Sequence, residues 1–234
     1  MKKERLDKFL SNQTGISRSE SRTSIKRGKV CVNGVAERDF SRLIDSETDI
    51  VVFGERQISY KRYIYLVLNK PAGIITASTD KTRKTVLDLV PAEYKRRGLT
   101  PVGRLDKDTT GLLIITDDGD FAHRCISPKS NIEKSYIAEL DGDINSDIIN
   151  DFKNGVVLAD GYKCKPAKLY DMGNKTVRIV ITEGKYHQIK RMFGVFSLGV
   201  NTLKRESVGG VGLPKDLAPG ECVEVPKMPD LIII

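Results

Sequence analysis

Residues 103–120 read GRLDKDTTGLLIITDDGD, in which five carboxylates flank the apolar run LLII. The apolar run is typical of a buried strand. Asp106 and Arg104 are two residues apart, so an extended backbone places both side chains on one side of the chain. Gly103 and Gly111 give the chain room to bend close to a ligand. A nearby cation would keep Asp106 ionised and oriented, which makes this carboxylate a candidate nucleophile or base.

Other interpretations of this stretch remain open on spacing alone. A calcium-binding loop has oxygen ligands at positions 1, 3, 5 and 12 with glycine at position 6. The match covers Asp106, Asp108 and Gly111, whereas position 5 is threonine, position 12 is aspartate and no helix pattern precedes the stretch. A glycosidase pair of Asp106 and Asp108 would have to flank a bond, and residues two apart share one face instead. A surface Arg–Asp pair in a turn is the interpretation that spacing alone favours.

The composition indicates a folded, basic protein. Its 234 residues suffice for one large domain or two smaller ones, and 39% hydrophobic residues supply a core. The net charge of +8 favours polyanionic partners. The four cysteines are far apart and form no C-x-x-C pair, so we expect no metal site and a reducing compartment. The start, MKKERLDKFL, is not a signal peptide and no apolar run is long enough to cross a membrane, which predicts a cytoplasmic protein.

The positive charge is concentrated near the N-terminus. Ser17 and Glu20 have the spacing of a capping box, and Gly28 is a suitable end for the helix that follows. Residues 30–37, VCVNGVAE, predict a hairpin around Asn-Gly. Cations spaced by four on the helix repel one another, and a bound phosphate backbone would relieve this repulsion. The candidate RNA-binding residues are Arg5, Lys8, Arg18, Arg22, Lys26, Arg27 and Lys29.

The rest of the chain predicts a larger α+β domain. The segments IYLVLNKPAG, KSYIAELDG, VVLADG, TVRIVITEG and ECVEV are typical of strands, and INSDIINDFKNG and HQIKRMFGVFSLG of helices. Many strands and few helices indicate a long mixed, mostly antiparallel sheet. We therefore expect a basic helix-helix-hairpin domain at 1–55, a linker at 56–62 and the larger domain at 63–234.

Several motifs resemble known families in the same order along the chain. RLDKFL, GISRSES and IKRGKVCVNG resemble the RNA-binding domain of ribosomal protein S4. GRLDKDTTG followed by TDDG resembles the catalytic motif of ribosomal RNA pseudouridine synthases, most of all the small-subunit (RsuA) type. NKPAG, the segment around Tyr136, EGKYHQIKRMF and VGGVGLPKDLAPGE match further motifs of that family. The resemblance covers nearly the whole chain.

The resemblance implies a cofactor-free isomerisation in which Asp106 is the essential carboxylate. Tyr136 would stack on a uracil that is flipped out of the RNA, and Ile189 would pack under that base. Arg104 would fill the gap left by the base or hold a phosphate. Lys190 would be the basic partner of Asp106, and Lys70 would support the site or contact RNA. Without the resemblance, we would interpret Tyr136 as a core residue.

The resemblance also implies a substrate. The motifs TDDG and HRxxSPxxxxEKxY favour uridine 516 of 16S ribosomal RNA, with a 23S uridine as the alternative. A monomer bound to ribosomal RNA is expected, without a membrane partner. An RNA-binding assembly factor with an idle synthase fold is the alternative from another class. His187 is expected to pack or to face RNA, and Asp108 to orient the loop or bond Arg104.

Overall fold

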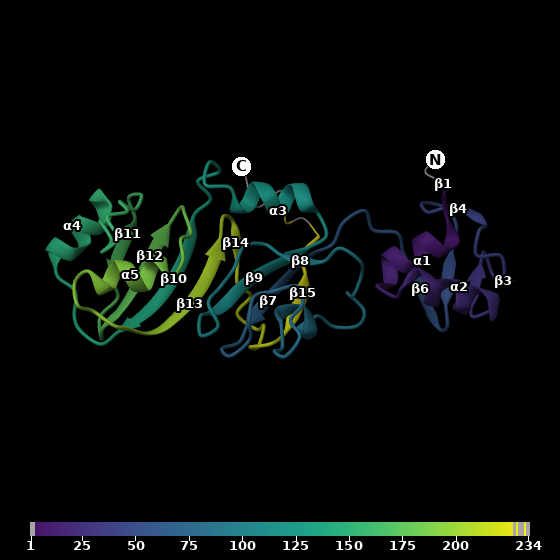
Figure 1. Ribbon diagram of the computed structural model, residues 1–234, viewed down its shortest axis with the longest axis horizontal. Helices are drawn as coiled ribbons and strands as arrows, with labels where there is room; N and C mark the ends of the chain where they lie inside the picture. The colour runs from purple at the N-terminus through teal and green to yellow at the C-terminus, as the bar shows by residue number, and fades with distance from the viewer. Residues whose placement is uncertain (1–2, 227, 229–231, 233–234) are drawn as a thin grey trace. The chain divides into compact units, whose positions relative to one another are not determined.

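The computed structural model describes residues 3–226, 228 and 232, which form two compact units (Figure 1). The N-terminal unit contains the described residues through Ile64 together with Val90–Leu99. The larger unit contains Tyr65–Leu89 and the described residues from Thr100 onward. The segment Val90–Leu99 thus leaves the larger unit in mid-sequence and packs with the N-terminal one.

The N-terminal unit combines two helices with short strands. These elements are α1 (Leu6–Thr14), α2 (Arg18–Lys26), β1 (Lys3–Arg5), β2 (Val30–Val32), β3 (Val35–Glu37), β4 (Leu43–Asp45), β5 (Val51–Phe53) and β6 (Arg56–Ile58). Strand β1 pairs with β4, and the order β3-β2-β5-β6 forms an antiparallel sheet. Leu6, Phe9, Leu10 and Ile25 of the helices are buried against the strands in one apolar core.

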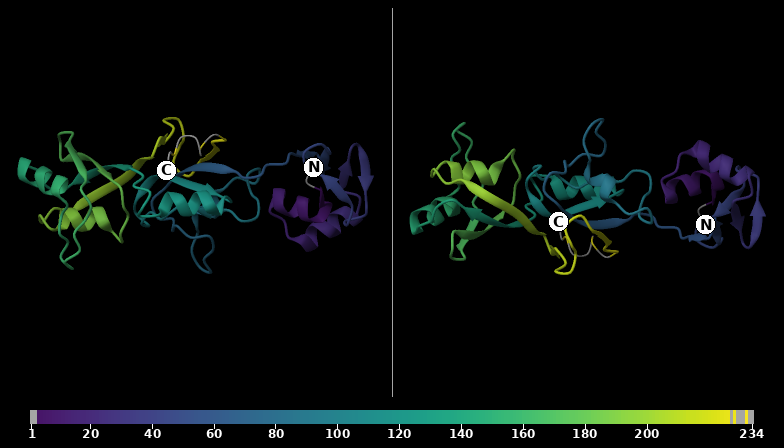
Figure 2. Two further views of the ribbon diagram at one scale, coloured as in Figure 1. Left: turned by 90° about the horizontal axis from the view of Figure 1, so that it is seen from above. Right: turned by 90° about the horizontal axis from the view of Figure 1, so that it is seen from below.

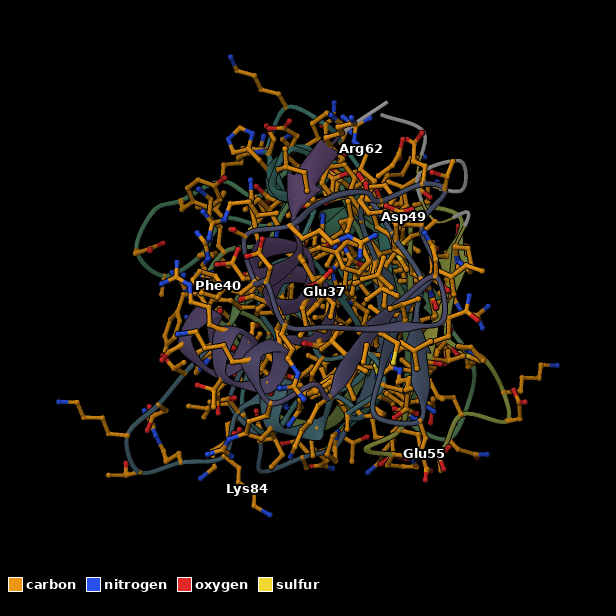
Figure 3. The ribbon with its side chains drawn as sticks, turned by 90° about the vertical axis from the view of Figure 1, so that its right-hand side faces the viewer. Glu37, Phe40, Asp49, Glu55, Arg62 and Lys84 are labelled. Atoms are coloured by element: carbon orange, nitrogen blue, oxygen red, sulfur yellow. The ribbon has the colours of Figure 1, made fainter. Side chains whose placement is uncertain are left out.

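Local sequence signals explain how these elements begin and end. Ser17 and Glu20 form the predicted capping box of α2, and Asn33 and Gly34 adopt the positive φ angles that the hairpin turn requires. Residues 56–58, expected in a linker, instead form β6, because their backbone groups pair with β5. In Figure 3, Phe40 lies on the side of the two helices, whereas Glu55 of the β5–β6 turn lies on the side of the strands.

The larger unit is built on a nine-stranded sheet. Its strands are β7 (Tyr65–Lys70), β8 (Thr100–Pro101), β9 (Thr110–Thr116), β10 (Lys134–Leu140), β11 (Lys168–Asp171), β12 (Thr176–Ile181), β13 (Val200–Val208), β14 (Val211–Gly212) and β15 (Cys222–Glu224). The order is β11-β12-β10-β13-β9-β7-β15, with β14 beside β13 and β8 beside β9. Only the β13–β9 pairing is parallel among the described strands, so the predicted mixed, mostly antiparallel sheet is confirmed.

Helices cover the two halves of this sheet. They are the 3₁₀ helix η1 (Val86–Leu89) and the α-helices α3 (Gly119–Ile126), α4 (Ser146–Asn154) and α5 (Gln188–Gly194). In Figure 1, α4 and α5 lie at the β11–β12 half, and α3 lies at the half that contains β9. Figure 2 shows β13 as a long strand that joins the two halves. Phe152 of α4 and Phe193 of α5 meet with ring centroids 4.9 Å apart, which fixes the two helices together.

Two segments differ from their prediction. Residues 156–161 were expected as a strand, but only an isolated bridge joins Val157 to Lys163, because Gly161 turns the chain early. The segment after β9 was not among the helices that the sequence predicts. Asp118 instead caps α3, where its side chain accepts a hydrogen bond from the Phe121 N–H at 3.0 Å.

Candidate active site

Asp106 lies in the loop between β8 and β9, and this loop is held from beneath by a buried lysine. Lys70, the last residue of β7, is 0% exposed. Its ammonium group donates to the carbonyls of Pro71 at 3.0 Å, Lys107 at 3.1 Å and Thr109 at 2.9 Å. Because two of these carbonyls follow Asp106 closely in sequence, the three bonds fix the backbone that presents the carboxylate. Lys70 was expected to support the site or to contact RNA, and its ammonium group is bonded to these three carbonyls.

Burial changes the acidity of Lys70. Removal from water lowers the pKa of the ammonium group to about 8, although the negative charges of Asp108 and Asp106 oppose this shift. With a pKa of about 8, Lys70 stays mostly protonated at neutral pH and loses its proton in the mildly basic range. Its three carbonyl partners favour the protonated form, because an ammonium group has three donors.

A pocket of about 450 Å³ opens beside Asp106, and we call it the Asp106 pocket. Its volume lies in the range of pockets that hold small organic ligands. Four other predicted site residues line it, namely Arg104, Tyr136, Ile189 and Lys190. The fold therefore brings together residues from the β8–β9 loop, β10 and α5, which are far apart in the sequence.

Tyr136 and Ile189 supply flat and apolar surface in this pocket. Tyr136 on β10 is 7% exposed, and Ile189 on α5 is 4% exposed. Arg104 is exposed at the pocket, and no ion pair joins it to Asp106 or Asp108 in the described part of the chain. The surface Arg–Asp pair that spacing alone favoured is therefore absent, and Arg104 is available to a ligand.

His187 is the side chain that approaches Asp106. Its Nε2 lies 3.5 Å from Asp106 Oδ1, and the two side chains are 37% and 28% exposed. The His187 backbone has φ of +48°, a left-handed conformation uncommon for a residue with a Cβ, at the N-terminus of α5. The Tyr186 ring stacks on the imidazole with centroids 3.9 Å apart. Sequence reasoning assigned His187 to packing or RNA contact and missed this approach.

Lys190 forms its ion pair with a different carboxylate from the one expected. Its ammonium group bonds to Asp108 and holds the pKa of that carboxyl below its usual value. Asp108 was expected to orient the loop or bond Arg104. The pair instead ties the β8–β9 loop to α5, and Lys190 still lines the Asp106 pocket.

A buried hydrogen-bond network shapes the turn before α5. Gln188 is 4% exposed, donates to Glu183 Oε1 at 2.7 Å and accepts from the Lys185 N–H at 2.9 Å. Glu183, 5% exposed, also accepts from the Tyr162 hydroxyl at 2.8 Å. Buried polar groups that are fully bonded specify one conformation. This network therefore fixes the turn that carries His187.

The basic residues of the N-terminal unit divide into two groups. Arg5, Arg18 and Arg22 converge on Asp7, which is 0% exposed, with the shortest contact 2.8 Å from Arg22 Nε. Burial raises the pKa of Asp7, but the hydrogen bonds from the three arginines outweigh it and lower the pKa to about 2. Asp7 thus relieves the repulsion between Arg18 and Arg22 of α2 without a bound phosphate.

The second group of cations faces solvent. Lys8, Lys26, Arg27 and Lys29 are exposed, and the Lys26 ammonium lies 5.1 Å from the centroid of the Phe40 ring. The three arginines on Asp7 also keep 40–46% of their side chains exposed. The seven predicted RNA-binding residues thus all retain surface that a polyanion can reach.

The comparisons with known proteins agree with this geometry. A model of the RNA pseudouridylate synthase family matches residues 64–194, and a model of the S4 domain matches residues 4–50. The chain is 42% identical to an uncharacterised RNA pseudouridine synthase of Bacillus subtilis (strain 168), over 94% of each chain. The chain belongs to the RNA pseudouridylate synthase family. The predicted family, fold and enzyme class are therefore confirmed.

Two further relatives extend the comparison. The ribosomal small subunit pseudouridine synthase A of Escherichia coli (strain K12) is 39% identical, over 93% of this chain and 94% of its own. A crystal structure of a pseudouridylate synthase superimposes with a TM-score of 0.68 at 32% identity, covering 98% of this synthase and 99% of that chain.

Other kinds of site are absent from the part of the synthase that the structure describes. Over these residues, no group of three or more His, Cys, Asp or Glu side chains is placed to hold a metal ion. None of the described helices has both the length and the apolar character needed to cross a membrane.

Proposed function

We propose that this synthase converts a uridine of 16S ribosomal RNA, uridine 516, into pseudouridine, with Asp106 acting on a nucleotide turned out of its stack. The observation that carries this proposal is the position of the Asp106 carboxylate in the wall of a pocket lined by Tyr136, Ile189 and Lys190. We further expect the protein to act as a cytoplasmic monomer.

The proposed reaction breaks the bond between ribose C1′ and uracil N1 and forms a bond between C1′ and C5. N1 gains a proton and C5 loses one, so substrate and product are isomers and no redox cofactor takes part. Asp106 attacks the ribose carbon, attacks the uracil, or removes a ribose proton on a glycal route. In each case the carboxylate must be ionised, and it lies 28% exposed beside the His187 imidazole.

The other pocket residues have separate roles in the proposal. Turning the base out costs a few kcal/mol, which the pocket must offset. The Tyr136 ring stacks on the uracil, and Ile189 packs against it from α5. Arg104 takes the space left by the base or holds a phosphate. Lys190 and Lys70 act on the loop, Lys190 through Asp108 and Lys70 through the loop carbonyls of Lys107 and Thr109.

The choice of substrate rests on similarity and charge. The small-subunit synthases of Escherichia coli and of Vibrio cholerae serotype O1 resemble this chain over 93% of its length. The basic S4 domain would position a structured RNA through phosphate contacts. A uridine of 23S RNA is the alternative substrate, because the two subfamilies share the motif around Asp106.

The test is to incubate the protein with unmodified 16S ribosomal RNA and to map pseudouridine by carbodiimide modification and primer extension. Asp106→Asn, which keeps the shape and removes the charge, is run in parallel. We expect one new stop at position 516 with the wild type and none with the variant. A stop at another position, or only in 23S RNA, would overturn the substrate. If no ribosomal RNA shows a stop although the protein binds the RNA in a salt-sensitive way, the result would favour the alternative of an RNA-binding assembly factor.

A further inference from the structure

A second pocket, of about 210 Å³, adjoins the Asp106 pocket, and we call it the basic pocket. The two pockets share Gly103, Arg104 and Tyr136 among their lining residues. The basic pocket is smaller than the usual range for a drug-sized or nucleoside ligand, and it is large enough for a phosphate group with a few waters. A ligand that occupies the Asp106 pocket can therefore extend into it.

The deepest cation of the basic pocket has an unused donor. Arg205 of β13 is 3% exposed, and its Nε donates to the Leu112 carbonyl at 2.7 Å. Its Nη2 is buried and has no hydrogen-bond partner among the residues that the structure describes. A buried guanidinium donor without an acceptor is costly, because water has been removed and nothing replaces it. Such a group favours an anionic ligand with oxygen acceptors.

A second cation lies against the first. Lys134 of β10 lines the same pocket, and its ammonium group donates to the Ile132 carbonyl at 3.1 Å. Burial and the neighbouring Arg205 charge lower the pKa of Lys134. No ion pair with a carboxylate joins either cation in the described part of the chain. Two adjacent, unneutralised cations stabilise an anion placed between them.

The rest of the pocket wall adds positive charge. Lys185 lies at the rim with its ammonium 4.8 Å from the centroid of the Tyr162 ring, and Lys165 bonds to the Pro128 carbonyl at 2.9 Å. The carboxylate in the wall is Glu183, whose oxygens already accept from Tyr162, Gln188 and a backbone N–H. No ion pair joins Glu183 to Arg205 or Lys134 among the described residues.

We propose that the basic pocket is the subsite for an RNA backbone phosphate next to the nucleotide whose base enters the Asp106 pocket. Arg205 and Lys134 bind the phosphate oxygens, and Arg104 and Lys185 attract the backbone at the rim. The inference rests on the proposed function, since it assumes that a uridine of RNA occupies the Asp106 pocket. It adds a phosphate contact inside the larger unit, separate from the contacts of the S4 domain.

The test is the salt dependence of kcat/KM for pseudouridine formation in 16S ribosomal RNA. Lys134→Met is the main variant, because an apolar replacement of a desolvated cation does not threaten folding. We expect kcat/KM to fall about tenfold because KM rises. The slope of log kcat/KM against log salt concentration should become less steep by about 0.7 for one lost phosphate contact. Lys134→Arg should restore most of both quantities. Lys153→Met, which removes an exposed lysine of α4, is the matched control and should change neither.

Arg205→Met provides a second variant, checked for folding by its melting temperature because Nε also holds Leu112. A slope equal to that of the wild type in Lys134→Met, with catalysis intact in the wild type, would overturn the phosphate subsite and leave the proposed function standing. If the wild type binds inorganic phosphate but Lys134→Met leaves the slope of kcat/KM against log salt unchanged, the subsite is overturned as well. If the wild type forms no pseudouridine in any ribosomal RNA, both proposals are wrong.

Discussion

At the scale of single residues, the most consequential group beneath the site is the Lys70 ammonium. Lys70→Met leaves the carbonyls of Pro71, Lys107 and Thr109 without their donor. We expect kcat to fall about 10- to 100-fold with little change in KM, because a carboxylate displaced by about 1 Å loses its reactive alignment. Single-turnover pseudouridine formation measures the effect, with Lys153→Met as the control. An unchanged kcat would show that the loop keeps its shape without this anchor.

The same lysine predicts a dependence of stability on pH. Its pKa is lowered from 10.5 to about 8 in the folded protein, so between these values the unfolded chain binds more protons than the folded one. Stability therefore rises with pH across this window, and below about pH 8 the buried charge costs stability in full. Lys70→Met should lack this rise. Urea unfolding of wild type and variant between about pH 7.5 and 10.5 compares the two slopes, and parallel slopes would contradict the assignment.

Pairings between residues explain what sequence could and could not predict about the site. The motif around Asp106 identified the candidate carboxylate, and Tyr136, Ile189 and Lys190 line its pocket. The approach of His187 to Asp106 depends on a left-handed backbone at His187, which no local pattern of HQIKR indicates. Side-chain partners across distant segments are set by tertiary geometry, and spacing in the sequence does not contain it.

At the scale of elements, the parallel contact between β9 and β13 depends on Gly111. Its φ is +96°, and a Cβ added there would meet the Arg205 carbonyl oxygen at 2.2 Å. Gly111→Ala should therefore destabilise the protein by about 3 kcal/mol or more, from backbone strain and overpacking together. Thermal and urea unfolding measure the loss. Gly119→Ala is the matched control, since a Cβ there meets nothing within 4 Å.

A result below about 1 kcal/mol for Gly111→Ala would mean that β9 and β13 separate easily. The control should be neutral or slightly stabilising, because alanine is favoured over glycine at the start of α3.

The strand patterns of β7, β9, β10 and β12 could be predicted from the sequence because their apolar residues are buried. Helix α3 was missed because its start, TDDG, has the composition of a turn.

The contact among β1, α1 and α2 depends on Asp7. Its pKa of about 2 lies below its usual 3.8, so its contribution is present above pH 3.8 and is lost as pH falls through about 2. We expect Asp7→Asn to remove about 1–2 kcal/mol near neutral pH, because solvent reaches the three arginines and weakens each pair. Hydrogen exchange of the backbone amides of α1 and α2 measures the stability of the N-terminal unit separately from that of the larger unit. Equal protection in wild type and variant at neutral pH would contradict the expectation.

At the scale of the whole molecule, the chain divides into two compact units, of which one matches the S4 domain and the other holds the Asp106 pocket. The larger unit is expected to bind one nucleotide and its neighbouring phosphate. The N-terminal unit carries exposed cations that have no carboxylate partner in the described structure, such as Arg27 and Lys29. Affinity and chemistry should therefore respond to different substitutions.

Arg27→Gln combined with Lys29→Gln should raise KM for 16S ribosomal RNA and leave kcat unchanged. Each lost phosphate contact lowers the salt slope of kcat/KM by about 0.7 to 0.9, so the loss of two contacts should lower it by about 1.4 to 1.8. Lys153→Gln combined with Lys215→Gln removes the same charge from exposed positions of the larger unit and serves as the control. Equal slopes in both double variants would indicate that net charge alone attracts the RNA. A fall in kcat would instead show that the N-terminal unit contributes to the chemical step.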